Sequence, residues 1–176
     1  MLTLIIGPNG SGKSRYAETL AASLEAKTRY YIATMVPYGE EGMARVNRHI
    51  AQREGLGFTT IERRTEVSLL AVGPEDTVLL EDVSNLAANS LFEKGQDAEA
   101  VVSDIVSLEK KCRNLIAVSI SGIHDADGAG EQTKGYIRML NDINAALVER
   151  SGCVVELDGG IPTIRKGALP CAQYRL

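Results

Sequence analysis

Eight consecutive residues near the start of the chain have the types and the spacing to bind phosphate. The stretch Gly7-Pro8-Asn9-Gly10-Ser11-Gly12-Lys13-Ser14 fits the pattern G-x-x-x-x-G-K-[ST] at every fixed position. Glycines let the backbone approach a ligand closely, and the N–H groups of such a loop form a concave site for an anion. Lys13 would place a positive charge on the β- and γ-phosphates of a nucleotide, and the Ser14 hydroxyl is a typical Mg²⁺ ligand. The stretch therefore predicts a nucleotide-binding P-loop.

The residues on either side of this loop provide the context that such a site requires. An apolar run, Leu2 to Ile6, is long enough for one buried strand, and residues 15–24 have the composition of a helix. A helix that begins directly after the loop adds free N–H groups and the positive end of its dipole. Strand, glycine-rich loop and helix in this order favour a phosphate site over a chance glycine-rich turn.

Two adjacent carboxylates follow another predicted strand. Thr77 to Leu80 is apolar beyond Thr77, as expected of a parallel strand that is buried on both faces, and it ends in Glu81 and Asp82. Beside a P-loop, a carboxylate at such a strand end can hold Mg²⁺ directly or through water. The alternative is that the pair only marks where the strand reaches solvent. The sequence favours a metal role for at least one of the two and does not decide which.

Strand and helix patterns alternate along the rest of the chain, which predicts one α/β domain over residues 1–176. We expect a P-loop NTPase-type, RecA-like fold of three layers, with a mainly parallel central sheet and helices on both faces. Ligands of such sheets bind beyond the carboxyl ends of the strands. That rule places the P-loop, Thr34, the Glu81–Asp82 pair and the loop 121–130 at one rim. The other predicted strands are 29–34, 58–61, 115–120, 153–157 and 163–165, and the other helices are 40–54, 66–71, 84–92, 98–112 and 131–150.

The only two histidines lie outside these motifs. Arg45, His49 and Arg53 are four residues apart in the predicted helix 40–54, so they share one helical face. Spacing alone favours a solvated basic stripe, but the same face could meet phosphates. His124 lies in the glycine-rich loop 121–130, and we interpret it as a surface residue.

Composition excludes several classes of protein. The 176 residues are 44% hydrophobic and 24% charged, with a formal net charge of −4 and no long basic run, which argues against a nucleic-acid surface. No apolar stretch approaches the length of a transmembrane helix, and the start lacks the pattern of a signal peptide. The three cysteines form no C-x-x-C pair and indicate no zinc site. We therefore expect a cytoplasmic protein with reduced, largely buried cysteines.

These motifs, in their order and spacing, resemble a known family. The chain is similar to the bifunctional adenosylcobinamide kinase / adenosylcobinamide-phosphate guanylyltransferase of cobalamin biosynthesis over most of its length. The stretch 31–34 (Y-I-A-T), the R-x-x-x-H spacing of Arg45 and His49, and the turn 160–162 (G-I-P) are more selective than the P-loop. The other matching segments are 11–18, 43–46, 79–81 with Asn89 eight residues on, and 142–144.

The resemblance implies two reactions and their ligands. A nucleoside triphosphate, ATP or GTP, phosphorylates the hydroxyl of the aminopropanol arm of a corrinoid substrate; GTP then transfers GMP to that phosphate through a covalent guanylyl-histidine. Lys13 and Mg²⁺ would serve the first reaction, with Ser14 and Glu81 on the metal side, and a histidine of the 45–53 helix would serve the second. The resemblance also implies a homo-oligomer, a trimer. The expectation of no nucleic-acid partner and no membrane span comes from the charge and the apolar runs described above.

Two departures from the family pattern bear on the second reaction. Arg48 stands where the family's first of two adjacent histidines is expected, and arginine stays protonated, so it cannot be a nucleophile. Either His49 is guanylylated instead or guanylyl transfer is lost. The family's Asn-Glu-Val-Gly loop is replaced by residues 119–123, Ser-Ile-Ser-Gly-Ile. Alternative hypotheses are a P-loop kinase for another small alcohol and a nucleotide-dependent interaction module.

Overall fold

The described part of the chain is built around one seven-stranded sheet. The computed structural model describes residues 1–37, 39–123 and 130–170, without the side chains at positions 41, 45, 48, 49 and 52. The strand order is β3-β2-β4-β5-β1-β6-β7, and every neighbouring pair is parallel except β6 and β7. The strands are β1 (Leu2–Gly7), β2 (Arg29–Ala33), β3 (Phe58–Glu62), β4 (Thr77–Glu81), β5 (Asn114–Ile120), β6 (Cys153–Asp158) and β7 (Ile161–Gly167).

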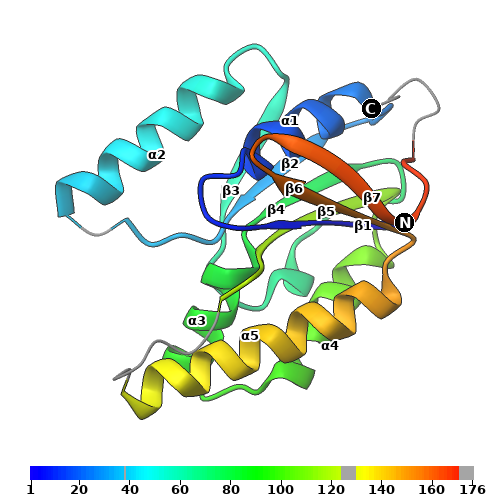
Figure 1. The fold of residues 1–176 in the computed structure, drawn as a ribbon. Helices are drawn as coiled ribbons and strands as arrows, with labels where there is room; N and C mark the ends of the chain where they lie inside the picture. The colour runs from blue at the N-terminus through cyan, green and yellow to red at the C-terminus, as the bar shows by residue number, and fades with distance from the viewer. Residues whose placement is uncertain (38, 124–129, 171–176) are drawn as a thin grey trace.

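Helices cover both faces of this sheet, as Figure 1 shows. Three helices, α3, α4 and α5, lie on one face, and α1 lies on the other. Helix α2 is on the same side as α1, but it stands out past the β3 edge of the sheet. The helices are α1 (Lys13–Ser23), α2 (Gly39–Arg53), α3 (Val83–Lys94), α4 (Ala98–Glu109) and α5 (Glu131–Arg150), with a single 3-10 turn, η1 (Val67–Leu69).

The side chains of the strands divide between two hydrophobic clusters because successive residues of a strand point to opposite faces. In β4, Val78 and Leu80 pack with α3, α4 and α5, whereas Leu79 packs with α1. All five residues of β4 are buried, as the apolar run predicted. The sheet is therefore sandwiched between two helical layers, which confirms the predicted three-layer arrangement.

Most of the predicted elements are confirmed, and one is wrong. Residues 66–71 do not form a helix; they form only the 3-10 turn Val67–Leu69, followed by extended backbone at Leu70. The Asp104 carboxylate of α4 accepts hydrogen bonds from the Val67 and Ser68 N–H groups, at 2.7 and 2.9 Å, and so holds the turn against α4. Val67 is the buried residue of this turn, and the extended backbone at Leu70 ends it after one turn.

Two further expectations concern membrane-spanning helices and the state of the cysteines. None of the helices in the described ranges combines the length and the apolar character needed to span a bilayer. Cys112 and Cys153 are buried free thiols, and burial raises the pKa of both, which disfavours the reactive thiolate form. Cys171 lies outside the described residues.

Candidate functional site

The P-loop connects β1 to α1, as predicted. Gly12 has a left-handed backbone, φ 86°, and is the N-cap of α1, so the helix begins at Lys13 with its free N–H groups beside the loop. The Lys13 side chain is buried, and its Nζ donates hydrogen bonds to the Pro8 carbonyl at 2.6 Å and to Ser11 Oγ at 3.4 Å. The loop thus places an ammonium group and the N-terminal end of a helix around one small concave site.

The first glycine of the loop is fixed by its neighbours in the sheet. A β-carbon at Gly7 would lie 2.2 Å from the backbone oxygen of Leu157 in β6 and 2.9 Å from Ser11 Oγ. Because β1 pairs with β6 on one side and with β5 on the other, the backbone at Gly7 has no room to move away. This position therefore requires glycine for reasons of packing as well as for ligand approach.

The hydroxyl that follows the lysine is hydrogen-bonded to one of the two predicted carboxylates. Ser14 Oγ donates to Glu81 Oε1 at 2.5 Å, although the two residues are 67 positions apart in the sequence. Glu81 is almost fully buried, and its second oxygen, Oε2, has no hydrogen-bond partner among the described residues. Burial, together with the adjacent charge of Asp82, raises the pKa of Glu81 above its usual range. An additional cation at Oε2 would stabilise the ionised form of this carboxylate.

Asp82, the second carboxylate of the pair, has a different role. Its Oδ1 accepts hydrogen bonds from the Asn85 N–H at 2.7 Å and from Ser84 Oγ at 2.7 Å, so Asp82 is the N-cap of α3. Of the pair, Glu81 contacts the P-loop serine and Asp82 begins the next helix. The sequence alone did not separate these roles, because both residues follow the same strand.

Two polar residues from the family-like motifs hold the rim together. Thr34 Oγ1 donates to the Asp82 carbonyl and accepts from the Asp82 N–H, both at 2.8 Å. Asn89 Nδ2 donates to the Thr34 carbonyl at 2.8 Å and to the Arg64 carbonyl at 3.1 Å. These bonds fix the end of β2 against the end of β4. Thr34 lies at the rim as predicted, and its contacts are with the protein backbone.

A third link joins the rim to α5. Asn144 Nδ2 donates to the Ile120 carbonyl at 2.9 Å, and Ser119 Oγ donates to Asn144 Oδ1 at 2.6 Å. The Ser121 N–H donates to the Gly7 carbonyl at 3.0 Å, which places the start of the 121–130 loop beside the P-loop. His124 lies outside the described residues, so the expected surface position of its side chain stays a prediction.

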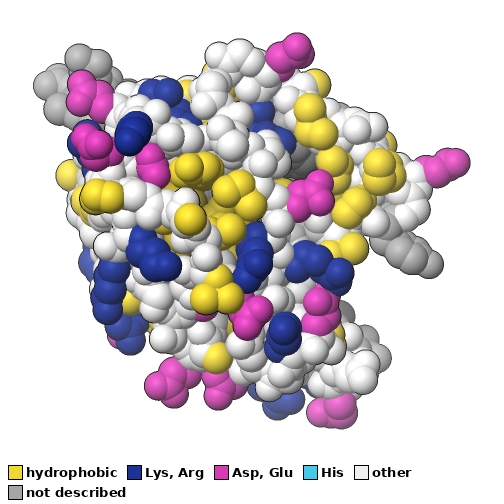
Figure 2. Space-filling view, turned by 180° about the vertical axis from the view of Figure 1, so that it is seen from behind, with side chains coloured by type: hydrophobic (Ala, Val, Ile, Leu, Met, Phe, Trp, Pro, Cys, Tyr) yellow, Lys and Arg dark blue, Asp and Glu magenta, His cyan; other side chains and the backbone are white. Residues whose placement is uncertain are grey.

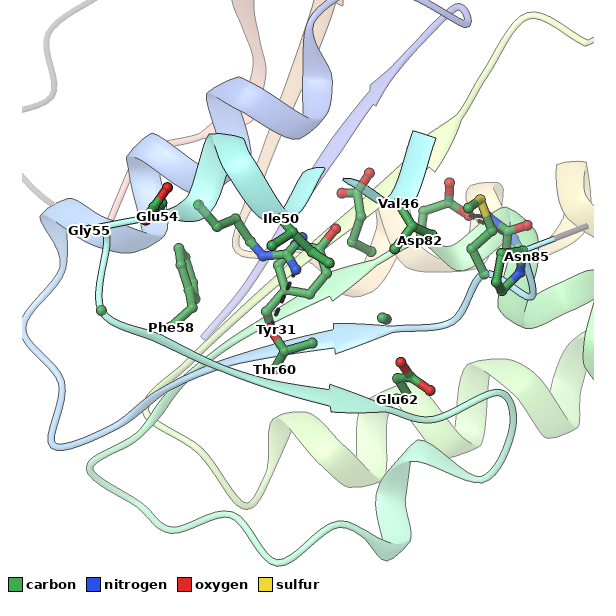
Figure 3. Close-up of a pocket in the computed structure, with 16 residues that line it drawn as sticks. Tyr31, Val46, Ile50, Glu54, Gly55, Phe58, Thr60, Glu62, Asp82 and Asn85 are labelled. Carbon is green, nitrogen blue, oxygen red and sulfur yellow. Dashed lines mark hydrogen bonds between the residues drawn. The ribbon is translucent and has the colours of Figure 1, made fainter. Parts of the chain in front are cut away.

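A pocket of about 820 Å³ opens beside Glu81, between α2 and the strands β2 and β3 (Figure 3). Val46 and Ile50 of α2 face the two strands across this space, and Asp82 and Asn85 lie at its P-loop end. Among the described residues, its lining combines apolar and aromatic side chains with four carboxylates and one cation: Tyr31, Ala33, Met35, Pro37, Val46, Ile50, Arg53, Glu54, Gly55, Gly57, Phe58, Thr60, Glu62, Glu81, Asp82 and Asn85.

The prediction of a solvated basic stripe on α2 is wrong for Arg53, which is buried. Its side chain is only 8% exposed, and its guanidinium carbon lies 3.5 Å from the centroid of the Tyr31 ring. Arg53 Nη2 also donates to Thr60 Oγ1 of β3 at 3.4 Å. The prediction was wrong here because the ring of Tyr31 offers a stacking surface that helix spacing cannot reveal. The side chains of Arg45 and His49 lie outside the described part of the structure.

Sequence reasoning missed one buried ionisable residue. Glu18 of α1 is 1% exposed, and its Oε1 has no hydrogen-bond partner among the described residues. Burial raises the pKa of Glu18 to about 7, and the nearby charge of Arg53 acts in the opposite direction. The available signal was its spacing: Glu18 lies one helical turn after Ser14, on the P-loop side of α1.

Several solved structures share the fold of this chain. The flagellar accessory protein FlaH of Methanocaldococcus jannaschii superposes on 94% of this chain and 78% of its own, with 14% identity and a TM-score of 0.52. A prototypical ATPase from the type III secretion system of pathogenic bacteria superposes on 93% of this chain and 56% of its own, with 12% identity and a TM-score of 0.53. At these identities the likeness shows the fold alone, and it confirms the predicted RecA-like P-loop fold.

Sequence relatives are more specific. The bifunctional adenosylcobalamin biosynthesis protein CobU of Escherichia coli (strain K12) is 33% identical over 113 residues, which span 62% of this chain and 61% of that relative. The protein of the same name from Salmonella typhimurium (strain LT2) is 31% identical over 124 residues, which span 69% of this chain and 67% of the relative. A family model described as cobinamide kinase / cobinamide phosphate guanyltransferase matches residues 3–164. The chain therefore belongs to the cobinamide kinase / cobinamide phosphate guanyltransferase family.

Proposed function

We propose that this chain is a nucleoside triphosphate-dependent adenosylcobinamide kinase, acting as one nucleotide-binding domain over residues 1–176. The observation that carries the proposal is the hydrogen bond from Ser14 Oγ to Glu81 Oε1. It joins the P-loop to a carboxylate that also lines the neighbouring pocket. A phosphate site and an acceptor pocket that share one residue are the arrangement that phosphoryl transfer requires, because catalysis here is mainly positioning and charge neutralisation.

The residues around Glu81 fit a Mg²⁺ ion. Mg²⁺ prefers oxygen ligands, and the buried Glu81 Oε2, which lacks a hydrogen-bond partner among the described residues, lies on the group that contacts the Ser14 hydroxyl. We propose that Ser14 and Glu81 hold the ion, Ser14 directly and Glu81 directly or through water. When bound, Mg²⁺ neutralises charge on the β- and γ-phosphates.

Other residues bind and orient the substrates in this proposal. The N–H groups of residues 7–14 and the Lys13 ammonium bind the triphosphate of ATP or GTP. The pocket receives the hydroxyl-bearing arm of the corrinoid, whose remainder is too large to enter about 820 Å³ and stays outside. Val46 and Ile50 of α2 cover the arm and exclude water from the reacting oxygen.

The kinase proposal is tested by direct product detection. Purified protein is incubated with Mg²⁺, cobinamide and either ATP or GTP, and cobinamide phosphate is measured by mass spectrometry. Wild-type protein forms the product with at least one of the two nucleotides, and Lys13→Ala forms none. The matched control is Lys110→Ala, since Lys110 is an exposed lysine at the end of α4, far from the P-loop in sequence. Product at the same level in wild type and Lys13→Ala contradicts the role proposed for Lys13. No product from wild type with any alcohol contradicts the kinase proposal and favours the interaction-module hypothesis, and phosphorylation of other alcohols only favours the alternative kinase.

The second family reaction is proposed for His49. Helix α2, which carries His49, also supplies Val46, Ile50 and Arg53 to the pocket beside Glu81, so this helix borders the space where the phosphorylated arm would lie. The protein is incubated with labelled GTP and denatured. An acid-labile, base-stable GMP adduct that is absent in His49→Ala supports a guanylyl-histidine at this position. No adduct, or one that survives His49→Ala, means that the role is not that of His49.

We also infer a homo-oligomer, a trimer by the family resemblance, and no nucleic-acid partner. Figure 2 shows hydrophobic side chains gathered on the face that carries α2. Val36, Met43 and Ile50, which are exposed by 44%, 50% and 54%, are the large apolar side chains of this segment. Patches of this kind mark interaction surfaces. Light scattering coupled to size-exclusion chromatography measures the mass, and a mass of one chain contradicts the inference.

A further inference from the structure

We propose that Arg53 binds the phosphate group of the phosphorylated acceptor, cobinamide phosphate, inside the pocket. This inference rests on the proposed function, and it adds a ligand-binding role to a residue of α2. It would keep the product of the first reaction in place for the second. Three observations carry it: the contacts of Arg53, the charges around the pocket, and the position of Arg53 relative to Glu81.

Arg53 is a buried cation with few contacts. Its side chain is only 8% exposed, yet among the described residues it makes one long hydrogen bond, to Thr60 Oγ1 at 3.4 Å, and no ion pair within 4.0 Å. A guanidinium has five N–H donors, so most of its donors are left for a ligand. The stacked contact with Tyr31 uses the flat face of the guanidinium. Its donors lie in the plane of the group, where they form the fork that matches a phosphate.

The charges of the pocket make this cation decisive for an anionic ligand. Four carboxylates line the pocket, those of Glu54, Glu62, Glu81 and Asp82, and Arg53 is the one Lys or Arg among its described lining residues. A phosphate beside these carboxylates is repelled by those that are ionised, and among the described lining residues Arg53 is the cation that offsets this repulsion. Among the described lining residues, Arg53 is therefore the one whose charge favours a phosphorylated over an unphosphorylated acceptor.

Arg53 lies close to the rim where phosphoryl transfer would occur. It stacks on Tyr31, which pairs with Leu79, whereas Glu81 pairs with Ala33, two residues further along the same strands. Two residues of a strand span about 7 Å. An arm that withdraws from the P-loop by this distance brings its new phosphate to the guanidinium. The pocket is continuous between the two points, since Tyr31, Ala33 and Glu81 all line it.

A purely structural role predicts something different. If Arg53 only anchors the end of α2 to Tyr31, its loss weakens the binding of every pocket ligand equally. A phosphate contact instead weakens only the ligand that carries phosphate. The two cases are therefore separated by comparing cobinamide with cobinamide phosphate, which differ by that one group.

The test is calorimetric binding of these two ligands to protein whose P-loop is saturated with Mg²⁺ and a non-hydrolysable ATP analogue. Wild type should bind cobinamide phosphate more tightly than cobinamide. In Arg53→Met, a neutral side chain of similar length, this preference should fall by about 10- to 100-fold, with a much smaller change for cobinamide. Arg53→Lys should restore part of it. The matched control is Arg138→Met, a substitution at an exposed arginine of α5 that should keep the full preference.

Equal weakening of both ligands by Arg53→Met, or an unchanged preference, would overturn the inference. A second experiment distinguishes failure of this inference from failure of the proposed function. With the P-loop filled, inorganic phosphate should raise the melting temperature of wild type and not of Arg53→Met. If wild type binds neither corrinoid but shows this phosphate effect, the acceptor assignment fails and the anion site at Arg53 stands. If wild type shows neither, the anion site fails as well.

Discussion

Helices α1 and α2 follow β1 and β2, two parallel strands of the same sheet, yet they are held to the sheet in opposite ways (Figure 1). Helix α1 buries Ala17, Leu20 and Ala21 in a hydrophobic cluster against the sheet. None of the described side chains of α2 belongs to either hydrophobic cluster, and Arg53 is the residue of α2 found buried. The helix that begins at the phosphate site is part of the core, whereas the helix over the pocket is held by a stacked cation.

This contrast separates two requirements of a kinase. The triphosphate is the same in every cycle, so a rigid binding site, whose groups need no rearrangement, favours catalysis. The acceptor must enter, react and leave, so the helix that covers its pocket can open more easily if it is only weakly attached to the sheet. Mutations on the α1 side should therefore affect stability and chemistry strongly, and mutations on the α2 side should affect mainly ligand selection.

The largest effect should come from the carboxylate that joins the two regions. Glu81→Gln removes the charge at the proposed Mg²⁺ site and should lower kcat by about 10²- to 10³-fold. The same substitution should not lower the free energy of unfolding. Burial raises the pKa of Glu81, so its ionised form is unfavourable in the folded protein, and the neutral amide avoids that cost. Steady-state kinetics and urea unfolding measure the two quantities. Asp82→Asn, which keeps the capping oxygen of α3, should cost far less kcat; a larger loss than for Glu81→Gln would reverse the assignment within the pair.

A matched pair of truncations tests the contrast in packing directly. Leu20→Ala in α1 should lower the free energy of unfolding by about 2–5 kcal/mol, because Leu20 is fully buried in the core. Ile50→Ala in α2 should lower it by less than about 1 kcal/mol, because the Ile50 side chain is 54% exposed. Both values are measured by urea denaturation. Equal losses would show that α2 is as firmly packed as α1 in solution.

The buried Glu18 should make stability depend on pH. In the unfolded chain a glutamate ionises near 4.5, and in the folded protein Glu18 keeps its proton to about pH 7. Between these values the folded state binds more protons than the unfolded state, so the free energy of unfolding falls as pH rises. Glu18→Gln should remove the part of this slope that Glu18 contributes and raise stability at pH 8 by up to about 3 kcal/mol, with little change at pH 4.

Unfolding is followed by circular dichroism across that range of pH. The exposed Glu25, in the connection after α1, supplies the control, since Glu25→Gln should leave the pH profile unchanged. A wild-type stability that rises from pH 4.5 to pH 7 and is unaffected by Glu18→Gln would mean that Glu18 is solvated in solution.

The smallest effect should come from the partner of Arg53 in β3. Thr60→Val replaces a hydroxyl that accepts a long hydrogen bond by a methyl group of the same shape, at a cost of less than about 1 kcal/mol. Amide hydrogen exchange should quicken in the last turn of α2 and stay unchanged in α1. Faster exchange in both helices would indicate that the two are coupled more closely than their packing suggests.

The sequence predicted the P-loop side of the molecule better than the pocket side, for a physical reason. Residues 7–14 and the start of α1 are defined by local backbone geometry, so their spacing was sufficient. Glu81 was placed correctly because parallel strands end at one rim, although its bond to Ser14 depends on tertiary structure. The burial of Arg53 depends on a ring from β2 and a hydroxyl from β3, which no local pattern encodes.

The close approach of the Leu157 carbonyl to Gly7 limits which amino-acid substitutions this part of the protein can accept. A side chain at this position would collide with the Leu157 carbonyl before any nucleotide arrived, so a defect there reports on strand assembly rather than on ligand affinity. Loss of activity at Gly7 therefore says little about phosphate binding, whereas loss at Lys13 addresses it. The same contact means that the edge hairpin of β6 and β7 and the phosphate loop are constrained together: a substitution in one must be compatible with the shape of the other.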